Sequence, residues 1–242
     1  MKFSPAMLRG TLCLAATLSF AFVSTAFAKA AEEEADQEVV QVIIDLLSEE
    51  DKDFRSLGLE QVRSGAKGPA ATKLFAEQLP KLSAQAQVGL LSALADRGDP
   101  VARPKVLETF ANNRDEAVRV AAIRAIGSLG DAEDLSLLIE LLASSSKLQQ
   151  ATARRSLTRL LGADVSAKMA GALKQNPPGI QAILIQILAE RRALDTIPIL
   201  LASAVGNDAT VRAAAMKALG QLADSGHVDG MVQAVLKAEP GR

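Results

Sequence analysis

Residues 115–131 read DEAVRVAAIRAIGSLGD, and residues 208–224 read DATVRAAAMKALGQLAD. The two stretches begin 93 residues apart, which is three times 31, and fainter copies of the pattern fill the space between them. In each copy apolar or small residues recur every three to four positions, as on one face of an α-helix. A fixed period of this length is typical of stacked helical hairpins. The sequence therefore predicts a helical repeat fold.

Each copy of the pattern is the second helix of a hairpin, and a first helix lies between consecutive copies. Turn signals such as Asp99-Pro100 separate the helices, and Asp115 and Asp208 are natural N-caps three residues before a Val-Arg pair. No strand-like alternation remains, so we expect an all-α chain of six helical pairs and one odd helix. The expected first helices are residues 39–48, 70–79, 102–112, 132–143, 165–175, 194–205 and 227–238.

The repeated residues resemble the HEAT repeat, in the subtype found in phycobilisome lyases, with the pattern D-x-x-V-R-x-x-A-x-x-A-L-G-x-L-G-D. Residues 115–131 match it almost throughout, and residues 208–224 depart from it at Ala223, where the pattern has Gly. The resemblance implies a right-handed α-solenoid of about six to seven stacked hairpins over residues 38–242. It says little about activity, because such repeats occur in enzymes, scaffolds and subunits of unrelated assemblies.

The first 28 residues have the features of a cleaved secretory signal peptide. Two basic residues precede an uncharged apolar run over residues 12–27, and Ala26 and Ala28 supply the small side chains that signal peptidase requires. A cut after Ala30 and an uncleaved membrane anchor are the alternatives, but the run is shorter than a comfortable span of about 20 residues. We expect an exported bacterial protein, periplasmic or secreted, without stable membrane insertion after cleavage.

Cysteine and charged residues are unevenly distributed along the chain. The only cysteine, Cys13, lies in the signal segment, so the mature chain has no disulfide and no Cys-ligated metal. Residues 30–51 hold nine acidic residues and no basic one, and residues 29–37 are expected to be a flexible, solvated acidic lead-in. An acidic tail that folds back on a basic groove is the alternative. The strongest units of the solenoid that follows are residues 101–131 and 194–224.

The sequence offers no recognisable catalytic constellation. No Gly-rich phosphate loop and no His-Glu-x-x-His motif is present. The single histidine, His227, stands near Ser225 and Asp229, but a triad is defined by geometry, and zinc would need several ligands. Carboxylate pairs of the glycosidase kind need only a suitable separation in space, and nothing points to one. We therefore expect a protein that is not an enzyme, with no catalytic residue, no metal and no cofactor.

Basic side chains on the second helices, which we expect to line the concave side, are better candidates for function. Arg124 and Lys217 lie there, and Arg119 and Arg212, at the repeat position itself, are expected to bridge to an Asp or a carbonyl of an adjacent unit. Arginines off the repeat pattern are candidates for a basic patch that binds an acidic protein or another polyanion, with solvated helix faces as the alternative. The patch consists of Arg154, Arg155, Arg159, Arg191 and Arg192.

The composition favours a protein partner over nucleic acid. The mature chain has three aromatic residues, Phe54, Phe75 and Phe110, which provide no platform for base stacking. We predict a non-catalytic protein–protein interaction scaffold that binds its partner on the concave face by shape and charge. The alternatives are a lyase-like or accessory subunit that holds a cofactor-bearing protein for modification, and a purely structural role in an envelope assembly.

Export predicts a shortened chain. The intact mass of the protein recovered from the cell envelope or the medium should correspond to a chain that begins at Lys29, because signal peptidase cuts after the small residue Ala28. The substitution Ala28→Leu should block this cut and leave a longer chain. Recovery of the wild-type protein with its first 28 residues attached would contradict the assignment.

Overall fold

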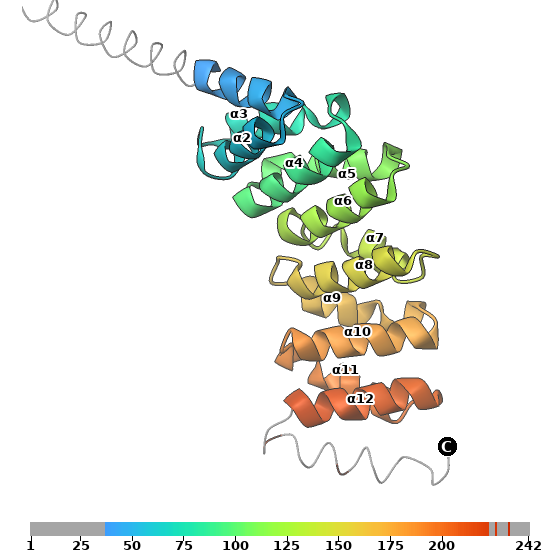
Figure 1. Cartoon of the computed structure of the whole chain (residues 1–242). Coiled ribbons are helices and arrows are strands. Elements are labelled where there is room, and N and C mark those ends of the chain that lie inside the picture. The colour runs from blue at the N-terminus through green and yellow to red at the C-terminus, as the bar shows by residue number, and fades with distance from the viewer. Residues whose placement is uncertain (1–36, 223–225, 227–231, 233–242) are drawn as a thin grey trace, which may run out of the picture.

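The computed structural model describes residues 37–222 together with residues 226 and 232, and every regular element within them is a helix. Consecutive helices form hairpins that stack on one another into an elongated array (Figure 1). The second helix of each hairpin packs on the second helix of the next, so these helices form one layer and the first helices form another. The architecture is the expected all-α solenoid.

The described chain contains six hairpins. The first helices are residues 37–48, α3 (Pro69–Ala76), α5 (Arg103–Asn112), α7 (Leu135–Leu141), α9 (Val165–Gly171) and α11 (Ile197–Ala204). The second helices are α2 (Lys52–Ser64), α4 (Ala84–Arg97), α6 (Glu116–Leu129), α8 (Lys147–Arg159), α10 (Pro178–Glu190) and α12 (Ala209–Leu222). Short 3-10 turns adjoin the first helices: η1 (Leu79–Lys81), η2 (Pro100–Ala102), η3 (Leu173–Gln175) and η4 (Leu194–Thr196). Of the helix expected over residues 227–238, the structure describes residue 232 alone.

The capping residues expected at the second helices are confirmed. Asp115 accepts a hydrogen bond from the amide of Val118 at 3.1 Å, and Asp208 accepts one from the amide of Val211 at 3.0 Å. Ser83 and Ser146 cap α4 and α8 in the same way. These side chains satisfy amides in the first turn that have no intrahelical partner. The starts of four second helices are thus set by their own local sequence.

Apart from the helix at residues 37–48, the first helices are shorter than the periodicity predicts. The helix expected over residues 70–79 ends at Ala76 and is followed by η1, where Pro80 has no amide hydrogen to continue the α-helical pattern. The helix expected over residues 132–143 begins only at Leu135, because the Asp134 carboxylate accepts from the amide of Asp131 and holds a turn in front of it. Local turns, which a hydrophobic period does not encode, decide these ends.

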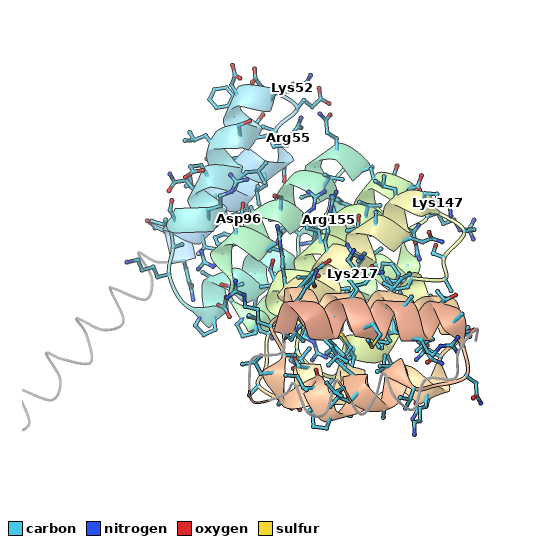
Figure 2. All side chains as sticks on the ribbon, turned by 90° about the horizontal axis from the view of Figure 1, so that it is seen from below. Lys52, Arg55, Asp96, Lys147, Arg155 and Lys217 are labelled. Atoms are coloured by element: carbon cyan, nitrogen blue, oxygen red, sulfur yellow. The ribbon has the colours of Figure 1, made fainter. Side chains whose placement is uncertain are left out.

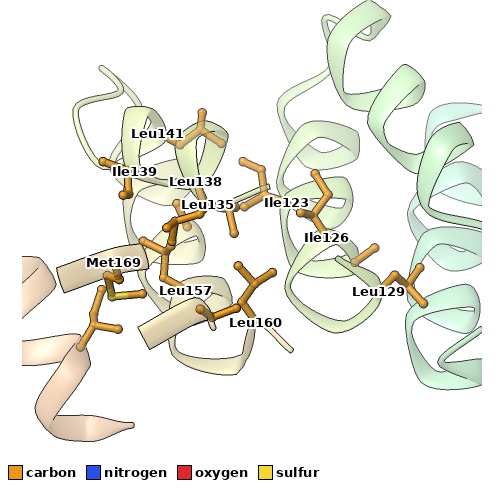
Figure 3. Close-up of a cluster of buried hydrophobic side chains, with 14 of the residues drawn as sticks. Ile123, Ile126, Leu129, Leu135, Leu138, Ile139, Leu141, Leu157, Leu160 and Met169 are labelled. Carbon is orange, nitrogen blue, oxygen red and sulfur yellow. The ribbon is translucent and has the colours of Figure 1, made fainter. Parts of the chain in front are cut away.

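A continuous apolar core lies between the two layers. Figure 3 shows one part of it, which contains Ile123 and Ile126 of α6, Leu138 of α7 and Leu157 of α8. All four side chains are fully buried. Burial of each such side chain contributes about 1.5–3 kcal/mol relative to exposure. The core crosses from one hairpin to the next, so each hairpin is stabilised by its neighbours.

Small residues allow consecutive second helices to approach closely. On α6, Ala122 and Ala125 are fully buried. A Cβ atom added to Gly127 would lie 2.7 Å from the Cα of Ser156 on α8, which is too close for two carbon atoms. The hydroxyl of Ser156 donates to the carbonyl of Ile123 at 2.8 Å between the same two helices. We call the contact between two consecutive second helices a seam. The backbones of α6 and α8 are therefore in contact at this point.

The close approach predicts that substitution by alanine has different effects on stability at two equivalent glycines. Gly127→Ala should destabilise the protein by about 1–3 kcal/mol, because the added methyl group must push α8 away. Gly220 holds the same repeat position in α12, and no described atom lies within 4 Å of its added Cβ. Gly220→Ala should be neutral or stabilising by up to about 1 kcal/mol, because alanine favours helix. Urea unfolding measures both, and equal stability of the two variants would contradict the contact.

Candidate binding surface on the second helices

Arg191, at the end of α10, holds the end of the preceding second helix. Its guanidinium donates to the carbonyls of Leu157, Thr158 and Leu160 at 2.9–3.0 Å, and to the hydroxyl of Ser166 at 3.2 Å. The last carbonyls of an α-helix have no intrahelical partner. Burial lowers the pKa of Arg191 from its usual value. The side chain is thus a C-terminal cap of α8.

Arg97, at the end of α4, makes the same kind of contact with the chain that follows α2. It donates to the carbonyls of Val62, Gly65 and Ala66 at 2.6–3.0 Å, and to the hydroxyl of Thr72 at 2.6 Å. Burial lowers its pKa as well, as for Arg191. Two of the seams between second helices are therefore bridged by an arginine that caps the helix before it.

The acidic residue beside each capping arginine also crosses the seam. Asp96 pairs with Arg63 of α2 at 3.0 Å, and Glu190 pairs with Arg154 of α8 at 2.5 Å. Residues 94–97 read LADR and residues 188–191 read LAER. The acidic residue and the capping arginine that follows it therefore occur in a four-residue motif that is present twice in the sequence. We call Asp96 with Arg97 and Glu190 with Arg191, together with their partners, the two clasps. They occur where consecutive second helices have the least contact.

One of the clasps engages two of the five arginines of the predicted basic patch, and the other three take no part in a clasp. Arg191 is engaged with carbonyls and Arg154 with Glu190. Arg192 is exposed in the turn after α10, with a left-handed φ of 55°. Arg155 and Arg159 are exposed, and no residue of the described chain accepts a hydrogen bond or forms an ion pair with either. The structure therefore does not bring the five predicted residues together as one free patch.

Arg155 and Arg159 instead share a hollow with Arg124, which the predicted patch did not include. The hollow lies between α6 and α8, has a volume of about 150 Å³, and is lined by these three arginines with Thr152 and Ser156. Arg124 is exposed and, within the described chain, also has no acidic partner. Its side chain and those of Arg155 and Arg159 form what we call the arginine cluster.

Arg124, a candidate from the sequence that lies outside the predicted patch, is related to Arg155 by the repeat period. Steps of 31 residues from Arg124 reach Arg155, then Gln186 and then Lys217, so these residues hold one position on four successive second helices. Figure 2, viewed along the stack, shows Arg155 and Lys217 on the same side of the array. Lys217 lines a second hollow of about 160 Å³ that also contains Arg154 and Glu190. The row of equivalent positions therefore runs along the exposed face of the second helices.

A larger groove lies away from the arginine cluster. It has a volume of about 590 Å³ and is bordered by α9, α11 and the start of α12, with Leu173, Pro198 and Ile199 among its lining residues. Lys174 is its one lysine or arginine. The two sides of the array thus differ in chemistry, with a mainly apolar groove beside the first helices and unpaired cations on the second helices.

The repeat arginines bridge within their own hairpin, so the expectation of a bridge to an adjacent unit was wrong. Arg119 donates to the carbonyls of Phe110 and Asn113 at 2.7 and 3.4 Å, and its guanidinium lies 4.2 Å from the ring centre of Phe110. Arg212 donates to the carbonyls of Gly206 and Asn207 at 3.0 and 2.8 Å. Each second helix begins directly after the turn of its hairpin, so the carbonyls at that turn lie within reach of these arginines.

A different arginine links adjacent units in the first-helix layer. Arg103, at the start of α5, donates two hydrogen bonds to the carboxylate of Asp134 at 2.8 and 3.0 Å. Asp134 is 3% exposed, and the hydrogen bond to it raises the pKa of Arg103 above its usual value. A paired geometry of this kind is the strongest that a guanidinium makes with a carboxylate. It joins the third hairpin to the fourth.

The described residues contain no group of three or more histidine, cysteine, aspartate or glutamate side chains that could hold a metal ion. Of the helices formed by these residues, none is both long and apolar enough to span a bilayer. The single histidine, His227, lies outside the described residues.

One of the comparisons with known proteins, the family profile, agrees with the fold. A family profile for HEAT repeats matches residues 72–158. No curated protein matches the chain. Among solved structures, human deoxyhypusine hydroxylase in complex with glycerol is similar, with 18% sequence identity, 87% of this chain and 93% of that chain covered, and a TM-score of 0.39.

Stacked hairpins with a shared core define an α-solenoid protein. The family profile matches the middle of this solenoid, so residues 72–158 are HEAT repeats.

The capping role of Arg191 predicts a loss of stability. Arg191→Ala should destabilise the protein by about 1–3 kcal/mol, because three carbonyls at the end of α8 lose their donor in a partly buried seam. Arg155→Ala removes a side chain of the same type that has no partner in the described chain, and should change stability by less than about 0.5 kcal/mol. Chemical unfolding of the two variants tests the assignment, which fails if Arg191→Ala is as stable as Arg155→Ala.

Proposed function

We propose that this protein is a non-catalytic scaffold that binds an acidic protein partner on the exposed face of its second helices. The observation that carries the proposal is the arginine cluster. Arg124, Arg155 and Arg159 line one hollow, and none of them has an acidic partner in the described chain. Unpaired cations on a fixed surface attract and orient an acidic partner.

The spacing of the cations suits an extended contact. Arg124, Arg155 and Lys217 hold equivalent positions on α6, α8 and α12. Packed helices lie about 8–10 Å apart, so the row from α6 to α12 spans roughly 24–30 Å. A rigid solenoid presents such a row without an ordering cost at the moment of binding. An acidic helix or strand of the partner lying across the second helices would meet several cations at once.

The surroundings of the row support a protein partner over nucleic acid. Phe75 is fully buried and Phe110 is 7% exposed, so neither offers a ring on which a base could stack. Phe54 is exposed, but it lies on α2 and outside the hollows that contain the cations. Export, which the signal segment indicates, would place the partner in the cell envelope or outside the cell.

Charge reversal on the second helices should abolish partner capture. The variant Arg124→Glu/Arg155→Glu/Arg159→Glu is offered as bait to the organism's envelope fraction, with cross-linking and quantitative identification of captured proteins. Partners of the wild-type bait should bind roughly 10- to 100-fold more weakly to the variant, because attraction is replaced by repulsion. Capture by the wild-type protein should also weaken as ionic strength rises.

A matched control carries the same change of charge elsewhere. Lys67→Glu/Lys73→Glu/Lys174→Glu alters three exposed cations in the turn after α2, on α3 and beside α9, none of which has a partner in the described chain. This control should retain the captured partners. Helicity and melting temperature should be unchanged in both variants. Retention of all partners by the Arg124, Arg155 and Arg159 variant would overturn the proposal.

A further inference from the structure

The arginine cluster lies beside a close contact between α6 and α8. Ser156 donates to the carbonyl of Ile123, and the backbone of α8 lies against Gly127. Arg124 directly follows Ile123, while Arg155 precedes Ser156 and Arg159 lies about one turn beyond it. Side chains four residues apart on a helix are neighbours on its surface. The cluster is therefore built on a rigid seam between two helices.

The polar groups of the hollow leave only guanidinium donors free. The hydroxyl of Thr152 donates to the carbonyl of Leu148 at 2.8 Å, and that of Ser156 donates to Ile123. Both hydroxyl protons are thus engaged, and their oxygens can only accept. No acidic residue lines the hollow. A ligand that fits this chemistry must be rich in acceptors and must carry negative charge.

The number of cations and the size of the hollow limit the ligand further. Three guanidinium groups repel one another, and a dianion offsets this repulsion better than a single carboxylate does. A volume of about 150 Å³ equals the space of about five water molecules. It accommodates a tetrahedral anion and is too small for a folded peptide. Arginine pairs with phosphate oxygens through two parallel hydrogen bonds.

We propose that the hollow between α6 and α8 is a phosphate-binding site, in which Arg124, Arg155 and Arg159 hold a phosphate dianion or a phosphate monoester. The proposal rests on the proposed function and deepens it, because it names the chemical group that these arginines recognise. The phosphate is either a free ion or a monoester carried by the partner. Both sources present the same tetrahedral, acceptor-only group.

Titration of the mature protein with inorganic phosphate and, separately, with O-phosphoserine tests the site. Ionic strength is kept constant with chloride, and binding is followed by calorimetry and by the Nε–Hε resonances of the arginines. Saturable binding of one phosphate group is expected, with shifts at the arginine cluster. Tighter binding of O-phosphoserine indicates a monoester on a partner, and tighter binding of inorganic phosphate indicates the free ion. Absence of saturable binding of both probes would overturn the proposal.

Three variants distinguish a specific phosphate site from diffuse electrostatic attraction between the protein and an anion. Arg155→Gln should abolish saturable binding. Arg155→Lys keeps the charge but loses the two parallel hydrogen bonds, and should weaken binding about tenfold. Lys174→Gln removes an exposed cation beside α9 and should bind as the wild-type protein does. Equal binding by the wild-type protein and Arg155→Lys, or equal weakening by Arg155→Gln and Lys174→Gln, would show diffuse attraction and overturn the site.

The two proposals fail separately. If neither phosphate probe binds while charge reversal still removes the captured partners, the phosphate site is wrong and the interaction surface stands. If phosphate binds saturably while charge reversal leaves the captured partners unchanged, the proposed partner surface is wrong and the phosphate site stands. Because Arg124, Arg155 and Arg159 are exposed and have no partner in the described chain, their substitution should leave the fold intact.

Discussion

The structure depends on one constraint, which is that no hairpin can cover its own apolar face. Each pair of helices buries its side chains against the pair before it and the pair after it, so every seam must be closed. Where α6 meets α8, closure comes from small residues, with Gly127 and Ser156 bringing two backbones into contact. Consecutive second helices are in similarly close contact at the seams α4–α6 and α10–α12.

The other two seams between second helices are closed by side chains. Arg97 and Arg191 reach back to free carbonyls at the end of the preceding second helix, and Asp96 and Glu190 pair with its arginines. An exposed ion pair alone contributes little. Hydrogen bonds to helix-end carbonyls in a partly buried seam contribute more, because those carbonyls would otherwise lack partners. The chain thus uses two ways to join units, close backbone packing and side-chain bridging.

The joining of units also determines which cations remain available. At the seam α8–α10 the bridge engages Arg154 and Arg191, so these residues serve the scaffold. At the seam α6–α8 the backbones themselves make the contact, and the acidic residue that crosses it, Glu116, accepts a hydrogen bond from Ser146 and pairs with no arginine. Arg124, Arg155 and Arg159 are therefore left without partners in the described chain, beside one hollow. The candidate surface is a consequence of how its seam is closed.

The sequence alone determined the fold class, the approximate helix positions and the helix caps at Asp115 and Asp208. It could do so because helical periodicity, turn residues and caps act over a few neighbouring residues. The 31-residue period also relates Arg124 to Arg155 and Lys217, although the departures from the repeat pattern directed attention to Arg191 and Arg192 instead. The repeat period therefore indicates the arginine cluster better than the departures from the repeat pattern do.

Only the tertiary structure decided which arginines are engaged. Arg119 reaches carbonyls of its own hairpin, and Arg191 reaches those of the hairpin before it. A guanidinium on a long side chain bonds to whichever acceptor the packing of the helices brings within about 3 Å. That packing depends on the size of the residues that meet at each seam, such as Gly127 against Ser156, and these residues lie about 30 positions apart in the chain. A local pattern contains no information about such a meeting, so the free cations become visible only once the hairpins are stacked.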